Sequence, residues 1–143
     1  MTPRSCSVAN ALEIVGERWS LLALREVFFG NTRFDQIAAN TGVSRDVLAA
    51  RLKKLVTAGV LEKVQYSTHP PRHEYHLTES GRALHNVLLM LKEWGDQYVT
   101  EEPLPLVYEH SCGNVLEPRV VCASCGEEAS LESLTRAPAS AAS

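Results

Sequence analysis

The change of hydrophobic period along the first hundred residues most constrains what this chain can fold into. Apolar residues recur at helical spacing up to Gly59, and residues 60–67 and 72–79 are then rich in residues that suit strands. A broad apolar helical stripe returns between residues 78 and 99. The sequence therefore predicts a mainly α-helical fold with one small β-hairpin and a long helix after it.

Four helices are expected before the hairpin. Ser7 can cap the first, and Gly30 ends the second. A short third helix runs to the turn at Thr41-Gly42, and Ser44 can cap the fourth. Two helices around a short turn, followed by a hairpin, are the order of a winged helix-turn-helix, in which the helix after the turn enters the DNA major groove.

The fourth helix has two different faces. Leu48, Leu52 and Leu55 keep helical spacing and are expected to hold it against the domain. The opposite face is then free to meet DNA. The DNA contacts predicted on or near this helix are Ser44, Arg45, Asp46, Ala49, Arg51, Lys53 and Lys54.

These residues are expected to act in different ways. Arg45 and Asp46 lie in the first turn, which usually meets base edges, and Ala49 is small enough to contact a thymine methyl. The later basic residues suit phosphates, which contribute affinity but little sequence information. The alternative is a solvated surface, with Arg51 paired to a carboxylate. Further contacts are predicted before the third helix and at the hairpin tip, from Thr32, Arg33, Arg72 and His73.

Charge is unevenly distributed along the chain. The net charge is −3, yet residues 44–76 carry six basic and three acidic side chains, whereas residues 101–143 carry two and seven. A locally positive stretch can attract DNA whatever the total charge. An ordinary solvated surface would have the same composition, so charge alone does not decide between the two interpretations.

Three long motifs carry a family resemblance. They are "CSVANALEIVGERWSLLALREVFFGNTRFDQI", "GVSRDVLAARLKKLVTAGVLEK" and "HPPRHEYHLTESGRAL", the last leading to "LKEWG". Over residues 6–99 the chain resembles the HxlR-type bacterial transcriptional regulators. The resemblance implies a dimeric winged-helix protein that binds double-stranded DNA at an operator near a promoter, with repression as the expected action. It also implies core positions for Trp19, Phe34, Leu52, Tyr75 and Leu77.

The same resemblance implies a sensing role for one cysteine. Several members respond to oxidants or electrophiles through a cysteine near the N-terminus, and Cys6 occupies that position. A reactive thiol must be exposed and readily ionised, which a helix N-terminus or a nearby cation promotes. Cys6 precedes the expected N-cap Ser7 and follows Arg4. The alternative is a small residue buried at a dimer interface.

Surplus apolar surface points to a homodimer. The helical stripe between Leu84 and Val99 includes Trp94 and Tyr98, more than a small domain of this type can cover. The first helix, residues 7–15, has a similar surplus. A two-fold dimer would read a palindromic operator. The alternative is that both helices pack on their own domain.

The last third of the chain contains a cluster of potential metal ligands. His110 and Cys112 are followed by the pair Cys122 and Cys125, and three thiolates with one imidazole would satisfy a structural zinc site. A disulfide, a redox pair and free thiols remain alternatives. DNA binding itself requires no cofactor.

The domain organisation follows from these assignments. Residues 1–100 are expected to form the DNA-binding and dimerisation domain, 101–109 a proline-marked linker, 110–128 the cysteine-rich appendage and 129–143 a disordered tail. No apolar run approaches a membrane span and no signal region precedes residue 10, so a cytoplasmic protein is expected.

Two classes of function remain. The favoured one is a DNA-binding regulator, with an oxidant or a small molecule as a compatible inducer. The alternative is a small redox or metal sensor in which the cysteines are the main function. An enzyme is not expected, because none of the five histidines pairs with a Ser or Cys nucleophile at a known spacing.

Overall fold

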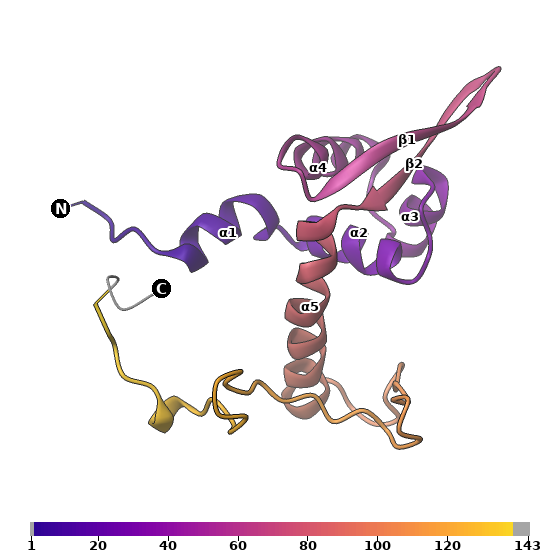
Figure 1. The fold of residues 1–143 in the computed structure, drawn as a ribbon. Helices are drawn as coiled ribbons and strands as arrows, with labels where there is room; N and C mark the ends of the chain where they lie inside the picture. Colours follow the sequence, from indigo (N-terminus) through magenta and orange to yellow (C-terminus); the bar gives the residue numbers. More distant parts are fainter. Residues whose placement is uncertain (1, 139–143) are drawn as a thin grey trace. The chain divides into compact units, whose positions relative to one another are not determined.

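The structure, a computed structural model, describes residues 2–138 of the chain. Two compact units make up the chain, residues 1–88 and residues 89–143. The elements are α1 (Ser7–Val15), α2 (Arg18–Phe28), α3 (Phe34–Thr41), α4 (Arg45–Thr57), β1 (Leu61–Thr68), β2 (Pro71–Leu77), α5 (Glu79–Tyr98) and the 3-10 turn η1 (Leu131–Ser133). The predicted mainly α-helical fold with one hairpin is confirmed (Figure 1).

The core of the first unit lies where α2 packs against α3 and α4. Leu48, Leu52 and Leu55 are all 0% exposed, so the predicted packing face of α4 is confirmed. The other buried apolar residues are Val15, Ala23, Leu24, Val27, Ile37, Val43, Val60, Leu61 and Tyr75. Of the five core positions implied by the resemblance, Leu52 and Tyr75 are buried; Trp19, Phe34 and Leu77 are half-buried and pack against this cluster.

Helix caps explain where three helices begin. Ser44 Oγ accepts a hydrogen bond from Val47 N at 3.4 Å, and Thr78 Oγ1 accepts one from Gly81 N at 3.2 Å. The expectation that Ser7 caps the first helix is wrong. Cys6 is the N-cap instead, and its Sγ accepts a hydrogen bond from Ala9 N at 3.3 Å.

The two strands form an antiparallel hairpin that extends from the helices of its unit (Figure 1). Strand pairing continues closer to the tip than the sequence indicated, from Leu61 opposite Leu77 to Thr68 opposite Pro71. Pro71 occupies the first position of its strand, where a missing N–H donor is tolerated. The register shifts between Gln65 and Ser67, which leaves Tyr66 without a partner residue at a bulge.

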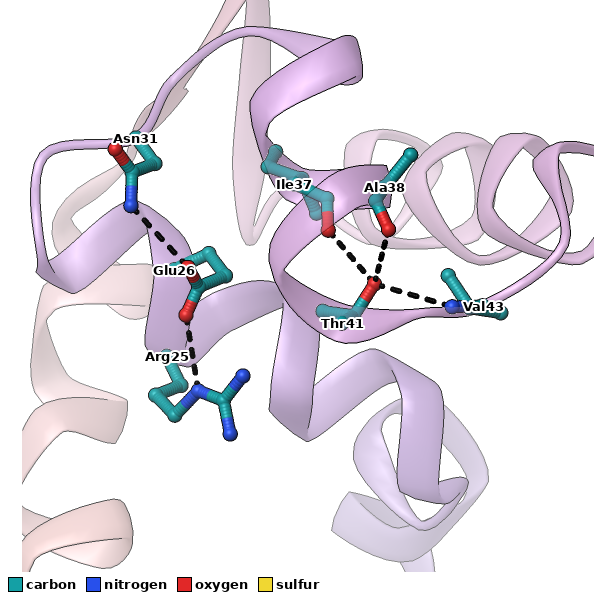
Figure 2. Close-up of polar contacts among 7 residues, drawn as sticks. All are labelled: Arg25, Glu26, Asn31, Ile37, Ala38, Thr41 and Val43. Atoms are coloured by element: carbon teal, nitrogen blue, oxygen red, sulfur yellow. Dashed lines mark hydrogen bonds and ion pairs between the residues drawn. The ribbon is translucent and has the colours of Figure 1, made fainter. Parts of the chain in front are cut away.

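A polar network that no sequence pattern predicts closes the end of α2. Glu26 is 3% exposed, and its two carboxylate oxygens accept hydrogen bonds from Arg25 Nε at 3.0 Å and Asn31 Nδ2 at 3.2 Å (Figure 2). The Asn31 backbone N–H also donates to the Glu26 carbonyl at 2.9 Å. Both charge and backbone of this buried residue are therefore satisfied, which fixes the path of the chain toward α3.

The turn between α3 and α4 is fixed in a similar way. Thr41 Oγ1 donates to the Ile37 carbonyl at 2.7 Å and accepts from Val43 N at 3.5 Å (Figure 2). Gly42 follows at φ 75°, the left-handed conformation that favours glycine at a helix C-terminus. The predicted Thr41-Gly42 turn is confirmed, and it sets the direction in which α4 leaves α3.

The second unit contains the end of α5 and two short loops. Isolated bridges pair Glu109 with Val115 and Val121 with Glu128. Within residues 129–143, which the sequence predicts to be disordered, η1 forms one 3-10 turn. Residues 139–143 of that predicted tail lie outside the described part of the chain.

Candidate DNA-binding surface

The outer face of α4 presents charged and small side chains to solvent. Ser44, Arg45, Asp46, Ala49, Lys53 and Lys54 are all exposed. Of these, Asp46, Ala49, Lys53 and Lys54 point away from the helix face formed by three leucines with no exposed surface. The helix therefore has the two-faced construction required of a helix that packs on its own domain while it enters a groove.

Arg45 is partly held by the neighbouring helix. Its Nη1 is 2.8 Å from Asp35 Oδ1, and its guanidinium carbon lies 4.7 Å from the centre of the Phe34 ring. Both side chains of the pair are well exposed, at 69% and 80%. An exposed pair of this kind contributes little stability, so the guanidinium can exchange Asp35 for a base edge at small cost.

Arg33 connects the start of α3 to the hairpin. Its guanidinium carbon lies 4.4 Å from the centre of the Tyr66 ring, and its Nε is 3.6 Å from Glu74 Oε1. The backbone joins the same two segments, because Tyr75 N donates to the Thr32 carbonyl at 2.8 Å. Thr32 and Arg33 are thus positioned beside the hairpin, and an exposed aromatic ring that the sequence did not single out, Tyr66, lies with them.

Glu74 is the charged centre of this junction. His76 Nε2 lies 2.9 Å from Glu74 Oε2, and this hydrogen bond is the largest cause that lowers the pKa of Glu74 from its usual value of 4.5. The positive charge of Arg33 lowers the pKa further, while partial burial opposes the shift. Glu74 therefore helps to hold the Arg33 side chain beside the hairpin.

Arg51 differs from the exposed residues of α4, and its predicted role as a phosphate contact stays a prediction. Its side chain is only 23% exposed and forms an ion pair with Glu17, which directly precedes α2. Arg51 is half-buried, whereas Lys53 and Lys54 are exposed. The alternative weighed from the sequence, pairing with a carboxylate, is the one observed.

The hairpin supplies the remaining predicted contacts. Arg72 is exposed next to the tip, whereas His73 is half-buried and pairs with Gln65 in the register. Lys63, on the preceding strand, is also exposed. It was not among the predicted contacts, although it is one of the six basic residues of the positively charged stretch 44–76.

Cys6 is exposed at the start of α1, where its sulfur accepts the amide hydrogen bond described above. No disulfide forms among the cysteines of the described residues. The structure therefore presents this thiol to solvent within a single chain.

The predicted zinc ligands are not gathered into one site. Among residues 2–138, no three His, Cys, Asp or Glu side chains are arranged to hold a metal ion. His110 and Cys112 lie in one short loop and Cys122 and Cys125 in another, and the His110 Nδ1 accepts a hydrogen bond from Cys112 N at 3.3 Å. The structure thus keeps the two ligand pairs in separate loops, and the four-ligand zinc site stays a prediction from spacing.

Cys122 differs chemically from an ordinary thiol. Hydrogen bonds from the backbone of Cys125 and then Ser124 lower the pKa of Cys122 below its usual value of 9.0. The second loop also closes through Gly126 N, which donates to the Cys122 carbonyl at 2.6 Å. This loop thus stabilises a thiolate at its first cysteine.

A helix-turn-helix with an exposed second helix and an adjacent β-hairpin defines the chain as a winged helix-turn-helix protein. None of the helices in the described residues is long and apolar enough to cross a membrane. Residues 14–103 match the HxlR-like helix-turn-helix family, and the chain belongs to that family. It is accordingly a transcriptional regulator with a helix-turn-helix DNA-binding fold, and not an enzyme.

Individual relatives agree with this assignment. The chain is 48% identical over 134 residues to the uncharacterised HTH-type transcriptional regulator Rv3095 of Mycobacterium tuberculosis, covering 92% of this chain and 85% of the relative. It is similar to the crystal structure of PA1607, a candidate transcription factor, with a TM-score of 0.80, 33% identity and coverage of 93% and 94%. The reduced form of the Bacillus subtilis regulator YodB has a TM-score of 0.57 and 31% identity, covering 71% of this chain and 99% of YodB; YodB has also been crystallised after diamide treatment.

Proposed function

We propose that the protein binds a palindromic operator in double-stranded DNA, with α4 in the major groove and the hairpin beside it. The observation that carries the proposal is the division of α4 into a fully buried leucine face and an exposed face with Arg45, Lys53 and Lys54. Binding beside a promoter would make the protein a repressor, and its place of action would be the cytoplasm.

Mobility-shift binding to the DNA upstream of the protein's own gene tests the proposal. Affinity should fall steeply with salt, because bound lysines and arginines displace counterions from phosphates. Arg45→Ala should change which operator variants bind best, whereas Lys53→Ala should weaken binding to all of them alike. Equal losses on every sequence from both variants would contradict the assigned roles.

A homodimer is part of the proposal. Val87, Leu91, Trp94 and Tyr98 recur at helical spacing along α5 and are 53%, 53%, 58% and 66% exposed. On α1, Val8 and Leu12 are 69% and 55% exposed, so both predicted apolar surpluses remain uncovered within one chain. A second copy is the occupant that supplies a matching apolar face, since two-fold interfaces are self-complementary.

We further propose that oxidants or electrophiles act through Cys6. Its exposure and its place at a helix N-terminus support this role, as does the similarity to YodB, which exists in reduced and diamide-treated forms. Diamide should change operator affinity of the native protein but not of Cys6→Ser. An unchanged response in Cys6→Ser would refute it and would favour the tail cysteines, the centre of the alternative sensor function.

Structural zinc in the tail remains a prediction from ligand spacing, to which this structure gives no support. Metal analysis of protein purified without chelators decides it, because structural zinc remains bound through purification. One equivalent, lost in Cys122→Ser and Cys125→Ser, would require the two loops to come together. Less than about half an equivalent of zinc per chain, with the thiols intact, would exclude a structural zinc site.

A further inference from the structure

The second unit contains a pocket that operator binding does not use. It has a volume of about 320 Å³ and lies between the end of α5 and residues 104–118. Leu89, Leu104, Val115 and Leu116 contribute apolar wall, and Tyr108 contributes an aromatic ring. Both the size and the mainly apolar lining are those of a small-molecule site.

The charges around the pocket restrict what it can accept. Lys92 is its one basic lining residue, and the Lys92 Nζ is 2.5 Å from Asp96 Oδ2, so these two charges neutralise each other. Glu93 and Glu117 also line the pocket, and neither has an ion-pair partner among residues 2–138. The lining therefore retains two uncompensated negative charges beside apolar walls.

Tyr108 also favours a positively charged ligand. The Lys92 Nζ lies 5.7 Å from the centre of its ring, within the range at which a ring face attracts a cation. The pocket thus already holds one ammonium group between a carboxylate and an aromatic face. Glu93 and Glu117 are the carboxylates of the lining that remain available to a ligand cation.

We propose that this pocket binds a small hydrophobic monocation, such as an aryl-alkyl ammonium compound. The apolar part would lie against the leucine and valine side chains, and the cationic group would lie toward Glu93, Glu117 and the Tyr108 ring. Organic anions of the same size should bind more weakly, because the two uncompensated carboxylates of the lining repel a negative charge.

The pocket also has a defined place on α5. Leu89, Lys92 and Asp96 line it, whereas Leu91, Trp94 and Tyr98 belong to the exposed apolar stripe. At 100° per residue these two sets fall on opposite sides of the helix. A ligand would therefore lie on the side of α5 opposite the face proposed for dimerisation. Regulation of operator binding by this ligand rests on the proposed function. Binding of the ligand does not.

Isothermal titration of the full chain with benzyltrimethylammonium tests the site, with benzyl alcohol and phenylacetate as neutral and anionic comparisons. We expect saturable binding of the cation at one site per chain, binding of the alcohol at least about tenfold weaker, and none of the anion. Binding of phenylacetate as tight as that of the cation, or no binding of any probe, would overturn the proposal.

Variants locate the site. Glu93→Gln and Glu117→Gln should each weaken cation binding about three- to tenfold, and Tyr108→Leu should reduce the preference for the cation over the alcohol. Glu101→Gln is the matched control, since it removes a carboxylate of the same unit that does not line the pocket. Unchanged affinity in the double variant Glu93→Gln, Glu117→Gln, with an unaltered circular dichroism spectrum, would refute the site.

Operator binding measured with and without benzyltrimethylammonium separates the site from its regulatory role. A shift of operator affinity that disappears in the double variant supports regulation through the pocket. Cation binding without such a shift, in protein that binds operator, would leave a ligand site and refute regulation. Failure to bind any DNA would refute the proposed function, while the titration would still decide the site.

Discussion

Basic side chains near α4 differ in how firmly their neighbours hold them. Arg51 is tied to Glu17 and is mostly covered, Arg45 has an exposed partner on α3, and Lys53 is exposed with no ion pair among the described residues. A side chain held inside the domain contributes to folding, whereas a free one can contribute to DNA affinity. The three residues should therefore respond differently to the same truncation.

Arg51→Ala should lower the free energy of unfolding by about 1–2 kcal/mol, because it removes a charged hydrogen bond and the packing of the side chain. Lys53→Ala should leave stability within about 0.5 kcal/mol while reducing the salt dependence of DNA binding by about one phosphate contact. Urea unfolding and salt titrations of operator binding measure the two effects. If instead Arg51→Ala weakened DNA binding and Lys53→Ala lowered stability, Arg51 would be a DNA contact.

Glu74 should make the stability of the hairpin junction dependent on pH. Its pKa is lowered in the folded protein, so its contribution is fully present above about 4.5 and is lost as the pH falls through the lower folded value. The difference in unfolding free energy between the native protein and Glu74→Gln should therefore shrink below about pH 4.5. Urea unfolding between pH 3 and 7 checks this, and a constant difference over that range would contradict it.

These residues also show what the sequence could and could not predict. Hydrophobic spacing identified Leu48, Leu52 and Leu55 correctly, because helix periodicity is a local property. Glu17, the partner of Arg51, lies 34 positions earlier in the chain. Glu74, the partner of Arg33, belongs to β2 of the hairpin. Pairs of this kind depend on how the elements pack against each other, and a local sequence pattern cannot predict that packing.

At the scale of elements, the start of α5 packs closely against the backbone just before β1. A Cβ atom added at Gly81 would lie 2.2 Å from the Val60 carbonyl oxygen, whereas one added at Gly95 would meet nothing within 4 Å. Both glycines are in the same helix. A glycine is required at position 81 because the backbone of Val60 approaches the helix there, whereas position 95 has no such requirement.

Gly81→Ala should therefore lower the free energy of unfolding by about 1–3 kcal/mol, as expected for an added methyl group that forces backbone to shift. Gly95→Ala is the matched control and should be neutral or stabilising by up to about 1 kcal/mol, because alanine favours the helix. Thermal and urea unfolding of both variants provides the comparison. Similar changes in stability in the two variants would mean that the contact with the Val60 carbonyl does not distinguish Gly81 from Gly95.

The hairpin shows the limit of prediction at this scale. Its two strands were expected from their β-branched and aromatic residues, but the bulge at Tyr66 was not. Pro71, which lies outside the two segments predicted as strands, starts β2. Strand ends and bulges are set by pairing between segments, so single-segment composition locates a hairpin without fixing its register.

At the scale of the whole molecule, the second half of α5 has a different environment on each side. Residues 104–118 lie along one side and line the pocket together with α5, while the stripe of Leu91, Trp94 and Tyr98 is exposed. Contiguous apolar surface of this kind usually marks an interaction site. The tail thus has a structural role in covering one side of this helix, which cysteine spacing alone did not indicate.

Trp94→Glu should convert the protein to a monomer, because it places a charge within the apolar stripe, where a dimer would bury it without a partner. Operator binding should weaken by at least about 100-fold, since each monomer would then bind only one half-site. Analytical ultracentrifugation and operator titrations measure the two losses. Glu93→Gln changes the neighbouring residue on the other side of the helix and should leave the dimer intact. A native protein that sediments as a monomer at the concentrations at which it binds a full operator would contradict the dimer.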